Sequence, residues 1–550
     1  MSVLPPLPPA AKVWSLLPPA LHKALLLGAE GTPRLLRLAH DNLSLLDNSP
    51  HRELLVRIFA DMFLCAWEGS LFDPQAASAL TQVQEQIRFL PPQAALFAAR
   101  CAQARPGSPQ AAKEAEALLA ARDIPAIQNF LETQRKTDPE NIFWMGFARY
   151  LGVHLHERDW YHDWLEAYTL PRGIIAAVQA DYLFAGQDFS GAACLYAEAH
   201  EQMPIPDLLV RQGECLNRLG SYTDAQELWL RALKERPWQS NLIFRLTDSL
   251  LGHNRAGEHP AGRGYVLLYT WNHGADLAQT LDSLAASDLG GARVLLLNNG
   301  STDDTAAIIQ KGSERFNGKL ETLDLPVNVG APAARNWLLH DPRVQAADWA
   351  VYIDDDALVP KDWLGFLGTA HRAFPDAGII GCRVVEKDAP LTMQSVDLHF
   401  EPIDPVQRQG NHPGNNILNG HINEADFGQY AYLRPCVSVT GCCHMFTRRS
   451  MDSVQGFDLR FSPSQFDDFE RDLRSSLAGD LPVYQGHLRI RHIKRNNMVT
   501  GMTPWQQANV AGNLVKLWKT YSPEQVQTIS NNDLRALQKA LQARLKVLPD

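Results

Sequence analysis

The chain has 550 residues, of which 45% are apolar and 20% are charged, and its formal net charge is -10. This length exceeds what one hydrophobic core organises, so we expect two or three globular domains. The acidic balance argues against a broad nucleic-acid-binding surface. No apolar run reaches the length of a membrane helix, and the opening segment lacks the pattern of a secretory signal. Eight cysteines without a C-x-x-C pair favour reduced thiols, so we expect a cytoplasmic protein.

Residues 1–251 are rich in Ala and Leu at helical spacing and predict an all-helical domain. Within residues 172–238, a shift of 33 superimposes small and large side chains at the same positions. The first set is Ala180, Leu183, Phe189, Ala192, Tyr196, Ala199 and Pro204, and the second is Gly213, Leu216, Tyr222, Ala225, Trp229, Ala232 and Pro237. This spacing resembles tetratricopeptide repeats; an ordinary helical bundle is the alternative.

The second half of the chain has a different pattern. Residues 252–263 are polar and rich in Gly, which is typical of a linker. From 264 to 498, continuous apolar runs of strand length, the last being "CVSVTG", alternate with helical segments. This order predicts an α/β domain whose mainly parallel sheet is covered on both faces. Residues 499–550 predict a C-terminal helical extension that packs back on the body through a stripe of leucines: Leu534, Leu537, Leu541 and Leu545.

One predicted strand ends in three consecutive carboxylates, within "DWAVYIDDDALVPKDWL" at residues 348–364. Asp354, Asp355 and Asp356 repel one another unless a positive charge lies among them. Carboxylate oxygens are the preferred ligands of Mg²⁺ and Mn²⁺, so the sequence predicts a divalent metal ion at this strand end. The alternative is that these residues form a turn and a helix cap.

Other strand ends and loops carry related signals. The segments are "YTWN" (269–272), "NNGSTDDT" (298–305), "NVGAPAARN" (328–336) and the later "VTGCCHMFTRRSMDSVQGFDLRFSPSQFDDFERDLRSSLAG" (439–479). In this order they resemble family 2 glycosyltransferases of the GT-A fold, over about residues 265–497. The resemblance implies an enzyme that moves a sugar from a nucleotide-sugar donor to an acceptor hydroxyl.

The resemblance also implies roles for individual residues. Asp356 corresponds to the direct metal ligand, and Asp354 to a residue that contacts the sugar nucleotide or a metal-bound water. His492 corresponds to a third metal ligand, with a structural histidine as the alternative. The expected nucleotide-sugar contacts are Thr270, Asn272, Asn299, Arg335, Asp354 and Asp355. Asn299 stands where relatives often carry Asp, so UDP-, dTDP- and GDP-linked donors stay open, and Arg335 has an exposed helix position as its alternative.

A second acidic pair, Asp467 and Asp468, opens a predicted helix. Ser464 and Asp467 fit a capping box, which would give Asp467 a structural role. Asp468 is then our choice for the general base that deprotonates the acceptor hydroxyl, in a single displacement that inverts the anomeric configuration. Likewise, Ser301 and Asp304 predict a capping box ahead of a helix through Ile309.

Three functional hypotheses remain at this stage. The first is a glycosyltransferase whose helical repeats bind a protein acceptor, such as a bacterial surface or flagellar protein, on a concave face. The second is transfer to a glycan or lipid-linked acceptor, with the repeats serving assembly. The third is a scaffold that binds nucleotide sugars without turnover. The long segment between residues 386 and 435 matches no pattern, although loops of that length are usually functional.

Overall fold

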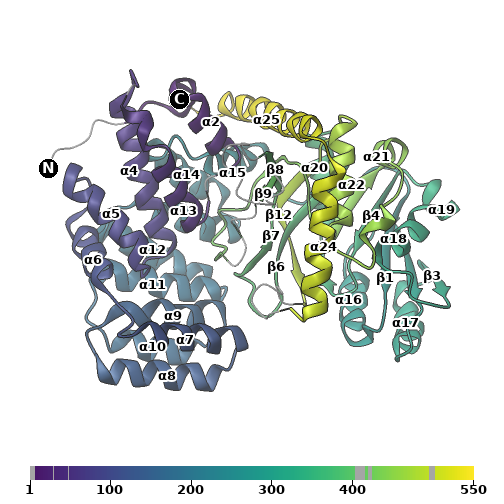
Figure 1. Ribbon diagram of the computed structural model, residues 1–550, viewed down its shortest axis with the longest axis horizontal. Coiled ribbons are helices and arrows are strands. Elements are labelled where there is room, and N and C mark those ends of the chain that lie inside the picture. The colour runs from purple at the N-terminus through teal and green to yellow at the C-terminus, as the bar shows by residue number, and fades with distance from the viewer. Residues whose placement is uncertain are drawn as a thin grey trace.

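The computed structural model places a helical region beside an α/β region, and the C-terminal helix α25 runs across the top of both in Figure 1. The first region contains the chain from α1 to α15. The second contains the large sheet and its covering helices. The structure describes residues 7–28, 30–47, 49–155, 157–402, 415–418, 421, 424–494 and 502–549.

The first region is all-helical, as the sequence predicts. Its α-helices in chain order are α1 (Ala10–Leu16), α2 (Pro19–Leu26), α3 (Thr32–Asp41), α4 (Arg52–Gly69), α5 (Pro74–Ile87), α6 (Pro92–Gln103), α7 (Pro109–Ala121), α8 (Ile124–Thr137), α9 (Met145–Arg149), α10 (Arg158–Glu166), α11 (Arg172–Ala185), α12 (Phe189–Gln202), α13 (Pro206–Arg218), α14 (Tyr222–Glu235) and α15 (Ser240–Leu251). A short π-helix, η3 (Tyr150–His154), follows α9 directly.

The 33-residue spacing corresponds to two helical hairpins, α11 with α12 and α13 with α14. Gly213 of α13 lies where an added Cβ would come within 2.5 Å of the Trp229 indole, so only glycine permits this approach. Trp229 and its counterpart Tyr196 are both buried, and each bonds to the first helix of its own hairpin, at Val210 and Asp181. The small and large positions of the pattern therefore set how closely consecutive helices pack.

The α/β region is built on one ten-stranded sheet among the described residues. Its strands are β1 (Gly264–Thr270), β2 (Arg293–Asn299), β3 (Leu320–Leu325), β4 (Trp349–Ile353), β5 (Ala357–Leu358), β6 (Ile379–Glu386), β7 (Met393–Ser395), β10 (Leu433–Pro435), β11 (Cys443–Thr447) and β12 (Val483–His492). Strands β8 (His399–Pro402) and β9 (Asn415–Leu418) form a separate pair. The helices are α16 (Gly274–Ala286), α17 (Thr305–Ser313), α18 (Ala331–Leu339), α19 (Pro342–Gln345), α20 (Trp363–Ala373), α21 (Arg448–Ser453), α22 (Asp467–Leu477), α24 (Pro504–Thr520) and α25 (Pro523–Leu545).

The order along the main path of the sheet is β10-β12-β6-β11-β4-β1-β2-β3. Strands β3, β2, β1 and β4 run parallel, as do β6 and β12, whereas β11 runs antiparallel between β4 and β6. The mainly parallel prediction is therefore confirmed. The predicted strand "CVSVTG" is wrong, because residues 436–442 form a buried loop between β10 and β11. The backbone N–H of Val439 in this loop bonds to the Asp472 carboxylate instead of to a neighbouring strand.

Both faces of the sheet are covered, which explains the continuous apolar strands. In β1, Val266 and Leu268 belong to one buried cluster with α16 and α20, while Tyr265 and Leu267 belong to another. Alternate residues of one strand thus enter two cores, since successive side chains point to opposite faces. At the C-terminus, Leu537 and Leu541 of α25 are buried, as the leucine stripe predicts.

Candidate functional site

The three consecutive carboxylates lie directly after β4, in the middle of the sheet. The backbone N–H of Asp354 donates to the carbonyl of Cys442, which precedes β11, at 3.2 Å. Asp356 is only 5% exposed. Asp355 points toward His273, with its Oδ1 3.6 Å from Nδ1 of that ring. The carboxylates of the turn therefore point in different directions. The antiparallel strand β11 starts beside Asp354.

His492, the last residue of β12, approaches the same turn from the other side. Its Nε2 lies 2.9 Å from Oδ1 of Asp356, and its Nδ1 lies 2.9 Å from Oε1 of Gln394. Burial favours the neutral forms of both groups, but the hydrogen bond between them raises the pKa of His492 and lowers the pKa of Asp356. Asp356 and His492 therefore form a charge-assisted pair.

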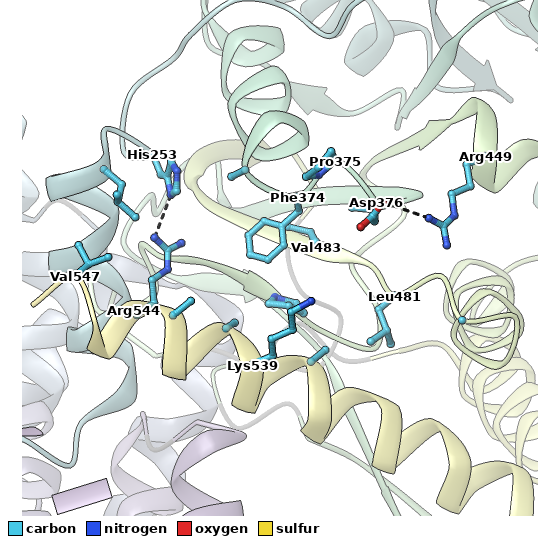
Figure 2. A pocket seen from close by; sticks show the side chains of 18 residues that line it. His253, Phe374, Pro375, Asp376, Arg449, Leu481, Val483, Lys539, Arg544 and Val547 are labelled. Carbon is cyan, nitrogen blue, oxygen red and sulfur yellow. Dashed lines mark hydrogen bonds and ion pairs between the residues drawn. The ribbon is translucent and has the colours of Figure 1, made fainter. Parts of the chain in front are cut away.

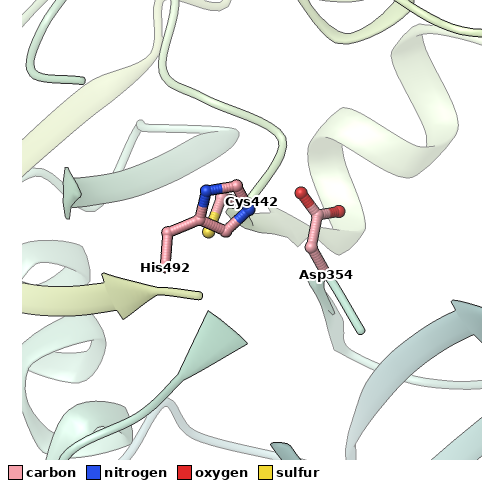
Figure 3. A group of neighbouring side chains, drawn as sticks. All are labelled: Asp354, Cys442 and His492. Atoms are coloured by element: carbon pink, nitrogen blue, oxygen red, sulfur yellow. The ribbon is translucent and has the colours of Figure 1, made fainter. Parts of the chain in front are cut away.

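A second arrangement suits a metal ion. One oxygen of Asp354, the sulfur of Cys442 and one nitrogen of His492 all lie within 4.8 Å of one another (Figure 3). Burial raises the pKa of Asp354 to about 6; the Arg335 charge opposes this shift and the Asp356 charge adds to it. A divalent ion would reverse the shift, because it favours the ionised carboxylate and thiolate. Carboxylate, imidazole and sulfur are all recognised ligand types, so these residues fit a divalent metal.

The structure thus brings together two of the three predicted metal ligands, Asp354 and His492. The third, Asp356, contacts the histidine ring and is not among the three converging atoms. Its role as a direct ligand remains a prediction.

Arg335, in the first turns of α18, connects the two acidic groups of the site. Its guanidinium Nη1 lies 2.5 Å from Oδ2 of Asp467, and its Nη2 lies 3.6 Å from Oδ1 of Asp354. The residue is 6% exposed and lies over the rings of Tyr269 and Phe457. The alternative of an exposed helix position is therefore wrong, because α18 turns this side chain into the sheet edge.

The helix α22 starts at Asp467 without the predicted capping box. Its N-cap residue is Phe466, whose φ of 67° is left-handed, and no side chain caps the helix. Asp467 is buried against Arg335, whereas Asp468 is half-buried and accepts a hydrogen bond from the backbone N–H of Gly441 at 2.7 Å. A left-handed non-glycine residue is costly, and such residues concentrate at functional sites. Only Asp468 of the pair keeps access to solvent.

The predicted nucleotide contacts lie at the ends of β1 and β2. The hydroxyl of Thr270 is buried and has no hydrogen-bond partner among the described residues. Asn299 donates from Nδ2 to Oδ1 of Asn328 and accepts from the N–H of Val329, both at 3.0 Å. Its amide therefore holds the loop ahead of α18. A contact from Asn299 to a nucleotide base remains a prediction that needs one of these bonds to open.

Asn272 stabilises the neighbouring loop. Its φ is 53°, and its Oδ1 accepts from the N–H of Thr302 at 2.7 Å. The predicted capping box of Ser301 and Asp304 is wrong, because the Ser301 hydroxyl accepts from the N–H of Asn272 and α17 begins only at Thr305. The N–H of Thr305 bonds instead to the carboxylate of Asp303, while the contacts of Asn272 join the loops that follow β1 and β2.

The comparison with family models concerns this part of the chain. Residues 265–452 match the model described as Glycosyl transferase family 2. The chain therefore contains a family 2 glycosyltransferase domain. The match includes every candidate residue named above up to Cys442, and it ends before Asp467, Asp468 and His492.

Among curated proteins, "O-antigen biosynthesis protein RfbC" of Myxococcus xanthus is 29% identical over 221 residues. The alignment covers 40% of this chain and 16% of that protein, so the chain spans a small part of its relative. Among solved structures, the mannosyltransferase PcManGT from Pyrobaculum calidifontis, in complex with GDP-Man and Mn²⁺, aligns over 58% of this chain and 84% of its own, with 17% identity and a TM-score of 0.36. GalNAc-T7 with UDP, GalNAc and Mn²⁺ aligns over 48% and 50%, with 13% identity and a TM-score of 0.35.

A separate cavity of about 600 Å³ lies at the end of strand β12 that is opposite to the candidate site (Figure 2). Val483, the first residue of β12, lines it, whereas His492 at the other end of that strand belongs to the candidate site. The alanines and Lys539 of α25 form one wall, and the residues after α20 form another. The cavity is therefore remote from the carboxylates.

Sequence reasoning missed two residues of the site in the family 2 domain. The cysteine pattern predicts only a reduced thiol at Cys442, yet its sulfur lies beside Asp354 and His492. Gln394 lies in the segment between residues 386 and 435 that matched no pattern, and it bonds to His492. The small-residue turn "TGCC" ahead of β11 was a usable signal for Cys442, but nothing in the sequence indicated Gln394. Residues 403–414, 419, 420, 422 and 423 of that segment lie outside the described residues.

Proposed function

We propose that this protein is a divalent-metal-dependent glycosyltransferase that moves a sugar from a nucleotide-sugar donor to an acceptor hydroxyl with inversion. One observation supports this best. Asp354, His492 and the Arg335–Asp467 pair meet at the end of β4, with Asp468 next in the chain to that pair. Ligands of parallel α/β sheets bind outside the carboxyl ends of the strands, so this edge is where a donor is expected. The family 2 match covers the strands of this sheet from β1 to β11.

In the proposed reaction, Asp354 and His492 hold the metal ion together with Asp356 or Cys442. The metal, Mn²⁺ or Mg²⁺, would offset the charge of the departing nucleoside diphosphate. Asp468 acts as the general base: its Oδ2 is held by the N–H of Gly441, and the side chain is half-buried. A fixed carboxylate with solvent access is suited to take a proton from an incoming hydroxyl.

Arg335 has the complementary task in this proposal. It pairs with Asp467 and lies near Asp354, so its charge opposes the rise in pKa that burial causes for both carboxylates. A nucleotide sugar brings further negative charge, which a buried guanidinium stabilises. Thr270, with its unpartnered buried hydroxyl, is the polar group on β1 that can bond to the nucleotide.

For the acceptor, we propose a protein segment bound by the helical region, as the helical hairpins α11–α14 offer an extended surface. A glycan acceptor is the second candidate, and the name of the relative RfbC, an O-antigen biosynthesis protein, favours it. A scaffold without turnover is the third, but a site of this kind would not need Asp468. The structure describes no helix with the length and apolarity that a membrane span requires.

The test is a panel of UDP-, dTDP- and GDP-linked sugars with Mn²⁺, followed by calorimetry for binding and by an assay for donor hydrolysis and transfer. We expect binding and slow hydrolysis with one donor class, both lost in Asp354→Asn, and hydrolysis or transfer lost with binding kept in Asp468→Asn. Asp452→Asn serves as control, because this carboxylate is exposed on α21 and its one ion pair among the described residues is with Arg448. Binding without hydrolysis or transfer to any acceptor would favour the scaffold.

A further inference from the structure

Strand β7 lies between the helical region and the candidate metal site. It pairs antiparallel with β6, and the turn that precedes it closes through a hydrogen bond from the N–H of Glu386 to the carbonyl of Thr392, at 3.1 Å. Gln394, in the middle of β7, extends its side chain to His492. This short strand therefore connects His492 to Thr392, and through Thr392 to the residues that contact its side chain.

The amide of Gln394 has only one orientation that satisfies its neighbours. Its Nε2 donates to the backbone carbonyl of Lys494 at 2.9 Å, and a carbonyl can only accept. Oε1 must then face Nδ1 of His492, 2.9 Å away, so Nδ1 carries the proton. Nε2 faces Asp356, and once it gives up the proton shared with that carboxylate it is the nitrogen that can bind a cation. Gln394 thus fixes both the tautomer and the orientation of the ring.

The helical region holds the other end of this link. Nδ1 of His154, in the π-helix η3, lies 2.9 Å from the hydroxyl of Thr392, and both residues are buried. Arg122, directly after α7, forms a buried ion pair with Glu386 at the end of β6. Two residues of the helical region therefore contact the two ends of the turn between β6 and β7. π-Helical turns are rare and occur often at functional sites.

We propose that the helical region positions the metal-binding histidine: His154 holds Thr392, β7 is thereby fixed, and Gln394 of β7 orients His492 for the cation. Gln394 and Thr392 are positioning residues that act through His492. The inference rests on the proposed metal site and goes beyond it, because it makes the N-terminal half part of that site. Partners of this kind typically change metal affinity by about 10- to 100-fold.

The experiment titrates the full chain with Mn²⁺ alone and follows the paramagnetic resonance signal of the free ion. We expect Gln394→Leu to weaken Mn²⁺ binding by about 10- to 100-fold. Gln394→Glu keeps an oxygen for Nδ1–H but places its second oxygen against the Lys494 carbonyl, so its loss of Mn²⁺ affinity should be clearly smaller than that in Gln394→Leu. Thr392→Val removes the contact with His154, and we expect a loss of about 2- to 10-fold, the size of one hydrogen bond. Ser395→Ala, on the same strand, is the matched control and should change nothing.

The outcomes separate the two proposals. Mn²⁺ binding that is equal in Gln394→Leu and in the unchanged protein would overturn the role of Gln394 while leaving the metal site intact. A loss in Gln394→Leu with none in Thr392→Val would overturn the contribution of the helical region. Failure of the unchanged protein to bind Mn²⁺ would remove the metal site and this inference together. Loss in Gln394→Glu equal to that in Gln394→Leu would indicate general disruption, which contradicts the positioning role.

Discussion

His399 of β8 is the centre of a buried charge cluster that joins distant parts of the chain. Its Nδ1 lies 2.8 Å from a carboxylate oxygen of Asp533 in α25, and its Nε2 lies 3.0 Å from one of Asp397. Asp397 also pairs with Arg434 of β10, whose guanidinium donates to the carbonyls of Leu26 and Leu27. The N-terminal helices, the sheet and the C-terminal helix therefore meet at this histidine.

This arrangement predicts a specific loss of stability in alkaline solution. Burial alone would lower the pKa of His399, but the carboxylates of Asp533 and Asp397 raise it to about 9, from an ordinary value of 6.5. The protonated ring therefore stabilises the fold fully below pH 6.5, and this stabilisation is lost as the pH rises through 9. A pKa difference of this size corresponds to about 3 kcal/mol.

Thermal unfolding between pH 6 and pH 10 measures the effect. A change of about 3 kcal/mol lowers the Tm of a region of 150–250 residues by about 6–12 °C. We expect this fall in the unchanged protein and a much flatter profile in His399→Gln. Protection of α25 from hydrogen exchange, relative to the intrinsic rate at each pH, should fall at high pH only when His399 is present. His340→Gln, which alters an exposed histidine, should keep the original profile. Identical pH profiles for His399→Gln and the unchanged protein would refute the reasoning.

Three further predictions concern the candidate site. Asp354→Asn should reduce Mn²⁺-dependent transfer more than about 100-fold, because the change removes a proposed metal ligand; unchanged transfer would contradict the site. Cys442→Ser should weaken binding of the soft ion Cd²⁺ more than that of Mn²⁺ in competition titrations, and equal losses would argue against sulfur as a ligand. Arg335→Met should destabilise the fold by about 3–5 kcal/mol in urea, since it leaves Asp467 buried and unpaired. Arg335→Met with Asp467→Leu should recover most of this loss, and no recovery would show that the pair is not the cause.

Much of the fold is visible in the sequence because it depends on local periodicity. The continuous apolar runs of the second half predict strands covered on both faces, and β1 indeed sends alternate side chains into two cores. The 33-residue spacing likewise predicts the helical hairpins in which Gly213 approaches Trp229. The strand ends also indicate where the carboxylates gather, since parallel strands deliver their ends to one edge.

The rest of the site depends on contacts between residues far apart in the chain. Arg335 and Asp467 are separated by 132 positions, and their pairing changes the role of both residues. A capping box is a pattern of four consecutive residues. It therefore gives no information on an ion pair between its carboxylate and an arginine that is distant in the chain. Cys442 and Gln394 reach His492 only because β11 and β7 lie where the sheet places them. No pattern of neighbouring residues in the sequence predicts those positions.

Arg434 has a consequence for the exchange of parts between enzymes of this kind. Its guanidinium bonds to carbonyl oxygens of Leu26 and Leu27, which belong to the backbone at the end of α2 and not to any side chain. Every residue has a backbone carbonyl, so acceptors of this type cannot be recognised from the amino-acid sequence. A chimaera that grafts another helical array onto this transferase must therefore preserve the path of the main chain at that point, whatever residues it carries there.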